Sequence, residues 1–467
     1  MADLADLVAQ NPWWQDPTAI DRDPQIRQLD RLPFRREPDV LRTFQLDQPN
    51  VYTLRGPRQV GKSTTVKLLI QRLIHAGFPA RRILYLSLEL ERQPRAIRDA
   101  VLRAKRHLPT HEAPWLIVLD ELSWVRDWQS AILSLRDRGD TSEDCLILTG
   151  SSARDIRSGG ERLPGRRGPG VDLDKVLLPL SFPEFLRATG RDPGIPPGSL
   201  EDLAWGTETS AIREAMLHFA DLDASFHDYL QVGGFPAAVA NFLSDGVVSE
   251  TTYQTLWHIV AGDVERSGRN RAAALKLLER VVRNLCNSSS WTSLAEEMAV
   301  AKAITAEEYA SVLADSFLLL VLYFLDLTHG SAAPKKEKKL YPSDPLLAYL
   351  PSRILPGVAA PDETALAEAV LAMALFRTRE AQLQEAFSVP RSLFYWKSSS
   401  GREIDFLSGQ QPSRVPVESK YAGRVNGNDR LVIRNVFQRG LIASRQTLDL
   451  DDPVRVIPTP IILALLG

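Results

Sequence analysis

A stretch of eight residues, 56–63, has the residue types needed to bind the phosphates of a nucleotide. It reads Gly-Pro-Arg-Gln-Val-Gly-Lys-Ser and fits the pattern G-x-x-x-x-G-K-[ST]. The apolar run 51–54 before it predicts a strand, and the run 64–70 after it predicts a helix. A glycine loop between a strand and a helix N-terminus directs backbone amides at an anion. The sequence therefore predicts a phosphate-binding loop, and the alternative is a chance match in a glycine turn.

The residues of this loop have separate expected roles. Gly56 and Gly61 let the backbone amides close around the phosphates. Lys62 is expected to reach the β- and γ-phosphates, and the Ser63 hydroxyl to bind Mg²⁺. ATP and Mg²⁺ are therefore the expected cofactors. The predicted nucleotide-binding residues are Gly56, Pro57, Arg58, Gln59, Val60, Gly61, Lys62, Ser63, Thr64 and Asp120.

Two adjacent carboxylates supply the second half of the expected site. Asp120 and Glu121 follow the apolar run 115–119, whose unbroken hydrophobicity predicts a parallel strand buried on both faces. We expect Asp120 to hold the Mg²⁺ with Ser63, and Glu121 to orient or deprotonate the attacking water. A further predicted strand, 145–148, ends in Thr149-Gly150-Ser151-Ser152. A polar residue there is a candidate sensor of the γ-phosphate, and a plain strand-ending turn is the alternative.

An arginine-rich segment follows this strand. Residues 154–170 are rich in glycine and contain Arg154, Arg157, Arg162, Arg166 and Arg167. One of these guanidinium groups is a candidate arginine finger for its own site or for that of a neighbouring subunit. The alternative is a flexible basic loop.

A second constellation of charged residues lies near the C-terminus, on the predicted strands 393–397, 403–407 and 415–420. Glu418 and Lys420 share one face of a strand, because side chains alternate with period two. Asp405 and Glu418 are candidate ligands of a divalent metal, and Lys420 is a candidate to position or activate water for attack on a phosphodiester. Glu368, on the predicted helix 364–376, adds a third acid. The alternative is a set of surface salt bridges.

Composition limits the class of protein. The chain has 467 residues, of which 44% are apolar and 24% charged, and its formal net charge is −2. These values are typical of a soluble globular protein, and any surface for nucleic acid must be local. Only two cysteines, Cys145 and Cys286, are present, which favours a reducing, cytoplasmic location. The longest apolar run, 317–325, is too short to span a bilayer, so it predicts a core helix and no membrane partner.

The order of the predicted elements indicates an α/β fold with several domains. From 51 to about 180 strands alternate with helices such as 95–108 and 128–138, which predicts a parallel sheet covered on both faces. We expect Trp13 and Trp14 of the lead-in to pack on this core, with a place near the adenine as the alternative. The predicted parts are a lead-in at 1–45, the core at 46–190, a helical region at 191–287, a winged-helix-like module at 288–345 and a small α/β domain at 346–467.

The winged-helix-like module has two interpretations. Its predicted helices, 292–299 and 304–325, favour a DNA-binding unit, whereas their glutamates favour a packing module. The lysine-rich run 335–339 is a candidate contact to a nucleic-acid backbone, and a solvated loop is the more common meaning of such a run.

Taken together, these motifs resemble a bacterial and archaeal family of AAA-type ATPases that carry a C-terminal domain of unknown function, DUF4143. The resemblance implies an AAA-type core, a helical and winged-helix middle and a C-terminal domain similar to restriction-endonuclease-like nucleases. It also implies that Glu121 and Arg166 are catalytic in the ATPase, and that Asp405, Glu418 and Lys420 form a nuclease-like triad. The chain departs from the family pattern at Ser419, where valine is usual. The motifs that carry the resemblance are 11–14, 56–63, 119–121, 148–152, 164–166, 179–185, 233–236, 401–406 and 417–420.

Three functions follow as hypotheses. The first is a Mg²⁺-dependent ATPase coupled to a DNA-associated C-terminal region. The second is a nucleotide-regulated DNA-binding or protein-interaction switch with an inactive nuclease-like domain. The third is an ATP-gated, metal-dependent DNA nuclease. Expected partners are ATP, DNA and a second copy of the chain.

Overall fold

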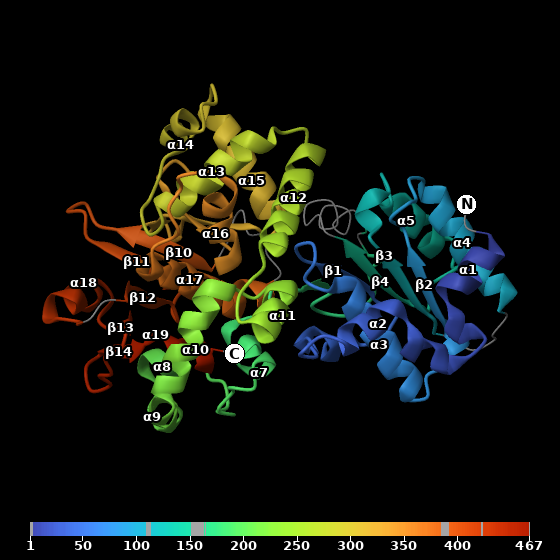
Figure 1. Cartoon of the computed structure of the whole chain (residues 1–467), viewed down its shortest axis with the longest axis horizontal. Coiled ribbons are helices and arrows are strands. Elements are labelled where there is room, and N and C mark those ends of the chain that lie inside the picture. Colours follow the sequence, from blue (N-terminus) through green and yellow to red (C-terminus); the bar gives the residue numbers. More distant parts are fainter. Residues whose placement is uncertain are drawn as a thin grey trace. The chain divides into compact units, whose positions relative to one another are not determined.

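The chain divides into two compact units, Met1–Leu178 and Pro179–Gly467, each with its own sheet (Figure 1). The computed structural model describes residues 3–108, 114–150, 163, 165–383, 392–421 and 424–466. Both units combine helices with a sheet, so the predicted α/β class is confirmed.

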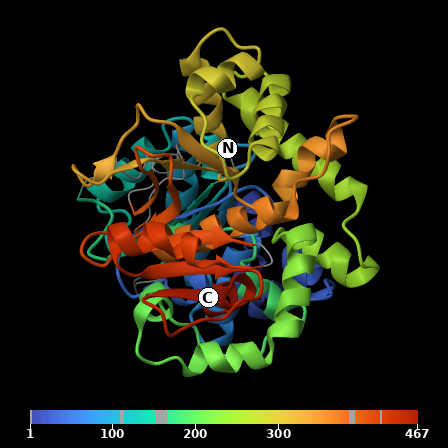
Figure 2. The same ribbon diagram turned by 90° about the vertical axis from the view of Figure 1, so that its left-hand side faces the viewer.

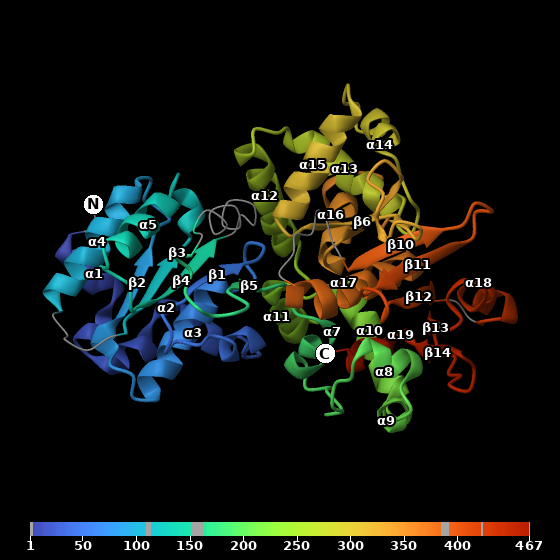
Figure 3. The same cartoon turned by 180° about the vertical axis from the view of Figure 1, so that it is seen from behind.

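A five-stranded parallel sheet forms the centre of the first unit, in the order β2-β3-β4-β1-β5. Three of these strands, β1, β3 and β4, are buried along their whole length, as their unbroken apolar runs predict. Helix α3 lies on one side of the strands and α4 and α5 lie on the other (Figures 1 and 3). The strands are Val51–Arg55 (β1), Ile83–Ser87 (β2), Leu116–Asp120 (β3), Cys145–Gly150 (β4) and Asp174–Val176 (β5), and the helices are Lys62–His75 (α3), Pro94–His107 (α4) and Gln129–Asp137 (α5).

The N-terminal segment covers the edge of this sheet at β2. The Asn11 side chain donates to the Tyr85 carbonyl at 2.9 Å and accepts from the Tyr85 N–H at 2.6 Å. The indole N–H groups of Trp13 and Trp14 both donate to the Ile83 carbonyl, and both rings are buried. The expected packing of the two tryptophans on the core is therefore observed. The segment consists of Leu4–Gln10 (α1), Pro12–Trp14 (η1), Pro17–Arg22 (η2), Pro24–Asp30 (α2) and Asp39–Arg42 (η3).

The second unit begins with helices and continues with a module of three helices and two paired strands. The first helices are Phe182–Ala188 (α7), Leu200–Trp205 (α8), Ser210–Leu217 (α9), Phe219–Val232 (α10), Pro236–Asp245 (α11) and Glu250–Arg266 (α12). The module consists of Arg271–Arg283 (α13), Trp291–Glu297 (α14), Ala303–Asp315 (α15), Leu319–Tyr323 (β6) and Lys338–Pro342 (β9). The pair Leu325–Asp326 (β7) and Ser331–Ala332 (β8) lies within the connection from β6 to β9. The assignment of this module as a winged helix stays a prediction.

One predicted helix of this region is wrong. The sequence predicts a helix over 304–325, but α15 ends at Asp315 and the apolar run 317–325 contains the strand β6. Phe317 has a φ of 59°, in the left-handed region that stops a helix. A short apolar run fits a buried strand as well as a buried helix, and here antiparallel pairing with β9 decides between them.

A mixed five-stranded sheet, in the order β10-β11-β12-β13-β14, forms the C-terminal part. The first three strands pair antiparallel, and β12, β13 and β14 pair parallel. Figure 2 shows these strands in orange and red, with the yellow helices of the preceding module at one end of the unit. The elements are Pro345–Ile354 (α16), Glu363–Leu383 (α17), Leu393–Lys397 (β10), Glu403–Ser408 (β11), Val415–Lys420 (β12), Gly427–Phe437 (α18), Gly440–Ser444 (β13), Val454–Pro458 (β14) and Thr459–Leu465 (α19).

The turn between α10 and α11 connects three parts of the second unit. The Gly234 carbonyl accepts from Leu180 N–H at 2.7 Å, and its own N–H donates to an Asp344 carboxylate oxygen at 2.8 Å. A Cβ at Gly234 would lie 2.0 Å from the Leu180 carbonyl oxygen. These contacts explain why the compact first unit ends at Leu178, before the predicted domain limit at 190.

Replacing Gly234 by alanine should destabilise the second unit, because backbone atoms of Leu180 cannot move away cheaply. We expect the free energy of unfolding to fall by about 1–3 kcal/mol. Denaturation of the full chain, followed by tryptophan fluorescence, measures this change. Gly262→Ala is the matched control, since Gly262 lies inside α12 with open space around it. That substitution should instead raise stability by about 0.5–1 kcal/mol. Equal effects of the two substitutions would contradict the steric argument.

Candidate functional site

The phosphate-binding pattern forms a loop between β1 and α3 in the first unit. Gly61 precedes the helix with a φ of 95°, and Gln59 also has a positive φ of 63°. Gly56 follows β1 with a φ of 154°, and a Cβ there would lie 2.0 Å from the Leu177 carbonyl oxygen. Both pattern glycines therefore stand where the backbone requires glycine.

The Lys62 ammonium is buried and lies within this loop. It donates to the carbonyl oxygens of Gly56 at 3.0 Å and Pro57 at 2.9 Å. The Arg36 guanidinium, from the N-terminal segment, donates to the Val60 carbonyl at 3.2 Å and fixes the loop from outside. Ser63 and Thr64 follow in the first turn of α3, where the helix N-terminus favours an anion. The loop thus has the lysine, hydroxyl groups and helix end that a triphosphate needs.

The carboxylate of Asp120 lies at the end of β3 and is held from the strands on both sides. One oxygen accepts from the Tyr85 hydroxyl of β2 at 2.6 Å, and the other accepts a short hydrogen bond from the Thr149 hydroxyl of β4. The Thr149 oxygen in turn accepts from the Glu121 N–H at 3.0 Å. Burial, then the charge of Asp120, raises the pKa of Tyr85, so its hydroxyl stays a donor. Asp120 and Glu121 are therefore fixed relative to each other through Thr149.

Glu121, the predicted general base, lies close enough to Lys62 of the phosphate loop for that charge to act on its carboxyl. Its backbone is left-handed, with a φ of 55°. Burial raises the pKa of its carboxyl, an effect opposed by the charge of Lys62 and reinforced by that of Asp120. A raised pKa makes a carboxylate a better proton acceptor. Among the candidate sensor residues, Thr149 is hydrogen-bonded to the Asp120 carboxylate and to the Glu121 backbone. Ser151 and Ser152 lie outside the described residues.

Several residues around this site were not predicted from the sequence. The Lys67 ammonium of α3 is buried, pairs with Asp23 at 3.1 Å and lies 3.7 Å from the centre of the Tyr85 ring. Trp124 has Arg58 of the phosphate loop at 5.5 Å and Arg92 at 4.9 Å from its ring centre. A lysine on a helix that follows a phosphate loop ordinarily indicates a solvent-facing position, so the sequence held no signal for Lys67.

Arg166 lies near the N-terminal end of β1, whereas the phosphate loop follows the C-terminal end of that strand. Its guanidinium pairs with Asp137 at 2.6 Å, and the next residue, Arg167, accepts from the Val51 N–H at the start of β1. The phosphate loop follows the other end of β1, about 15 Å away for a five-residue strand. This position does not serve as a finger for the site of the same chain. A role in a neighbouring subunit stays a prediction, and Arg154, Arg157 and Arg162 lie outside the described residues.

In the second unit the predicted charged residues do come together. The register of β11 and β12 places Asp405 opposite Glu418, and the Asp405 N–H donates to a Glu418 oxygen at 3.3 Å. The Lys420 ammonium lies 3.2 Å from the other Glu418 oxygen. Glu368, on α17, faces the same group and accepts from the Tyr341 hydroxyl at 2.7 Å. Burial first and the Asp405 charge second raise the pKa of both Glu368 and Glu418.

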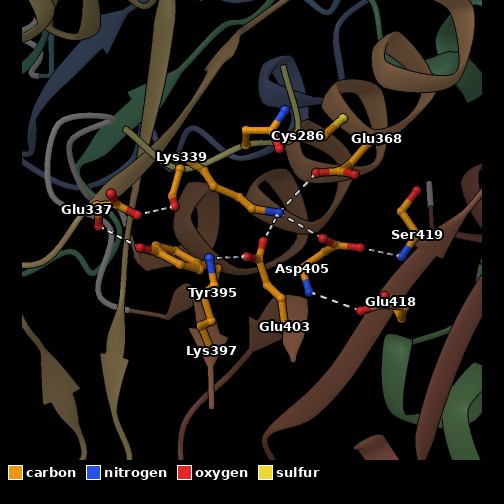
Figure 4. A network of polar contacts seen from close by, with 12 residues as sticks. Cys286, Glu337, Lys339, Glu368, Tyr395, Lys397, Glu403, Asp405, Glu418 and Ser419 are labelled. Carbon is orange, nitrogen blue, oxygen red and sulfur yellow. Dashed lines mark hydrogen bonds and ion pairs between the residues drawn. The ribbon is translucent and has the colours of Figure 1, made fainter. Parts of the chain in front are cut away.

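The centre of this group is Lys339, which was not predicted to belong to it. Its ammonium lies 2.6 Å from Glu403, 2.8 Å from Asp405 and 3.3 Å from Glu368 (Figure 4). Burial lowers the pKa of Lys339, but the surrounding carboxylates outweigh burial and raise that pKa well above its usual value. The sequence places Lys339 in a run of charged residues that is typical of a solvated loop, which hid its buried position.

Two further properties concern metals and membranes. Among the residues that the structure describes, no group of three or more histidine, cysteine, aspartate and glutamate side chains is arranged to hold a metal ion. The roles of Asp405 and Glu418 as metal ligands therefore stay predictions. No helix in the described part of the chain is long and apolar enough to cross a bilayer.

Comparison with known proteins assigns the first unit to a broad class. Residues 48–186 match the family model described as an AAA domain, so this part of the chain is an AAA-type domain. Residues 223–353 match a domain of unknown function, DUF8612, whereas the resemblance predicted DUF4143. A search of curated proteins found no significantly similar sequence.

The chain is also similar to solved structures, at low identity. The Walker-type ATPase PABY2304 of Pyrococcus abyssi shares 12% identity at a TM-score of 0.40, over 75% of this chain and 97% of that one. The ORC1 protein of Aeropyrum pernix, solved with DNA, shares 14% at 0.29, over 77% and 96%. The ORC2 protein of the same organism, in ADPNP and ADP complexes, shares 12% at 0.32, over 58% and 81%. These low scores assign no function to this chain.

Thr149→Val should separate binding from chemistry at the first site, because valine keeps the shape of threonine and removes the hydroxyl between Asp120 and Glu121. We expect the turnover number for ATP, the expected substrate, to fall about 10- to 100-fold. Nucleotide affinity should change little, since Thr149 is not part of the phosphate loop. Steady-state kinetics with a nucleotide-binding titration measures both quantities. Thr141→Val is the control, a buried threonine located before β4, and unchanged turnover in Thr149→Val would refute the assigned role.

Proposed function

We propose that the first unit binds ATP together with Mg²⁺ and hydrolyses it. The observation that carries the proposal is the fixed pair of acids, Asp120 and Glu121, at the same edge of the sheet as the phosphate loop. Strand β4 lies between β1, which leads into the loop, and β3, which ends in the acids. Loop and acids are therefore two strands apart, about 10 Å, which leaves room for a γ-phosphate and a water molecule.

The residues of the site have separate proposed roles in hydrolysis. The loop amides and Lys62 bind the β- and γ-phosphates and stabilise the negative charge that develops on them. Ser63 and Asp120 would hold Mg²⁺, which would neutralise phosphate charge. Glu121 accepts a proton from the water whose oxygen attacks the γ-phosphorus. The bond between that phosphorus and the bridging oxygen breaks, and ADP and phosphate leave.

Two substitutions test this assignment in different ways. Glu121→Gln keeps the shape of the side chain but cannot accept the proton, so we expect ATP binding to remain and turnover to fall about 10²- to 10⁴-fold. Lys62→Ala should lose ATP binding as well, because the ammonium that faces the phosphates is gone.

Phosphate release and a fluorescent ATP analogue measure turnover and binding. Glu143→Gln is the matched control, since Glu143 is exposed in the turn before β4, at the other end of the strands from the acids. Normal turnover in Lys62→Ala would refute the proposed site.

A second candidate function, association with DNA, concerns the module from α13 to β9. The order of three helices followed by two antiparallel strands is the order of a winged helix, and Lys335 and Lys336 are exposed before β9. The helices themselves present paired acids, because Glu297 pairs with Arg280 and Glu308 with Arg269. These features favour a contact to the DNA backbone by the loop rather than insertion of a helix into a groove.

Reversing the charge of Lys335 and Lys336 should weaken this contact. If the two lysines contact phosphates, the double substitution to glutamate reduces the slope of log affinity against log salt by about 1.8. Fluorescence anisotropy of labelled double-stranded DNA at several salt concentrations measures the slope. Arg31→Glu with Arg42→Glu, two exposed positions of the first unit, gives the same change of net charge and should leave the slope unchanged. Equal effects of both pairs would indicate non-specific attraction.

A further inference from the structure

A buried lysine stands where three carboxylates of the second unit converge. Glu368 comes from α17, Glu403 and Asp405 come from β11, and the ammonium comes from Lys339 of β9 (Figure 4). Its distances to the three carboxylates, 2.6, 2.8 and 3.3 Å, are those of charge-assisted hydrogen bonds. The side chain of Lys339 is only 1% exposed. The ammonium is therefore an integral part of the group.

A divalent metal ion bound at this point would need oxygens of the same three carboxylates, and one of them, Asp405, is also a predicted metal ligand. Mg²⁺ and Mn²⁺ prefer carboxylate ligands, and a binding site forms where several such oxygens point at one place. That place is filled by the ammonium, whose positive charge would also repel a second cation. The backbone of Lys339 is held in place, since β9 pairs along its length with β6, and its side chain is buried.

The other polar atoms around the group are also engaged. Asp405 accepts from the Ser419 N–H at 2.9 Å through its second oxygen, and Glu368 accepts from Tyr341. Lys420, the candidate water-activating lysine, lies against Glu418. These hydrogen bonds and ion pairs join β9, α17, β11 and β12 into one network of polar side chains.

We propose that the Lys339 ammonium occupies the position that a divalent metal ion would take among these carboxylates of the second unit. The group around Asp405, Glu418 and Lys420 then binds no Mg²⁺ or Mn²⁺ in the natural chain and does not cleave DNA. Replacing Lys339 by an uncharged side chain of similar length opens a site for a divalent cation. This inference is independent of ATP hydrolysis in the first unit.

The test is a titration of the full chain with Mn²⁺ alone, in the absence of nucleotide. Lys339→Met removes the charge and keeps an unbranched side chain. We expect this variant to bind one Mn²⁺ more than the wild type, as counted by the loss of the free-Mn²⁺ signal in electron paramagnetic resonance. The extra Mn²⁺ should disappear when Asp405→Asn is added to Lys339→Met. This double variant also corrects for any Mn²⁺ that the first unit holds, because Ser63 and Asp120 are unchanged in it.

The wild-type chain supplies a test that does not depend on the folding of the variant. Wild type and Asp405→Asn should bind the same amount of Mn²⁺, and neither should cut plasmid DNA in its presence. Mn²⁺ bound by the wild type and lost in Asp405→Asn would overturn the proposal, as would DNA cleavage lost in that variant. A folded Lys339→Met chain that gains no Mn²⁺ would overturn it as well. Circular dichroism with and without Mn²⁺ establishes whether the variant is folded.

Discussion

The carboxylate of Asp120 is held between a phenol on one neighbouring strand and a hydroxyl on the other, and the geometry of the first site depends on these two hydrogen bonds. A lone carboxylate at a strand end could rotate freely, and its neighbour Glu121 would have no fixed place. Because the Thr149 oxygen also accepts from the Glu121 backbone, a single hydroxyl sets the positions of both acids. The parallel sheet is what makes this possible, since it aligns the ends of three strands at one edge.

The two units treat their buried carboxylates in different ways. In the first unit the two donors to the Asp120 carboxylate, the hydroxyl groups of Tyr85 and Thr149, carry no charge. In the second unit the carboxylates receive the charge of Lys339 from their own chain. A buried carboxylate requires a partner in either case, because its desolvation is costly. Whether that partner is part of the chain or comes from solution decides between a stabilising cluster and a reactive centre.

The sequence predicts those features that depend on local pattern. The loop 56–63, the acids after 115–119 and the strand positions of Asp405 and Glu418 follow from residue types at fixed spacing, and the structure places them as expected. What could not be predicted depends on contacts between distant segments. Lys339 is buried because carboxylates 29 and 66 residues away surround it, and no local pattern shows this.

The errors have the same origin. The apolar run 317–325 becomes the strand β6 only through its pairing with β9, and the strands β13 and β14 are parallel additions to a sheet whose first three strands alone were predicted. Arg166 follows a candidate sensor strand in sequence, yet it pairs with Asp137 and its neighbour Arg167 contacts the start of β1. Nearness along the chain was therefore a poor guide to nearness in space.

The contact of Asn11 with Tyr85 has a consequence for how the protein behaves among other copies of itself. The amide of this side chain presents one donor and one acceptor to Tyr85, and so imitates the backbone of an additional strand alongside β2. An exposed strand edge is a template on which a foreign chain can pair. A chain that lacks residues 1–14 would leave the Tyr85 N–H and carbonyl open to such pairing. The N-terminal segment thus covers a strand edge on which another copy of the chain could otherwise pair.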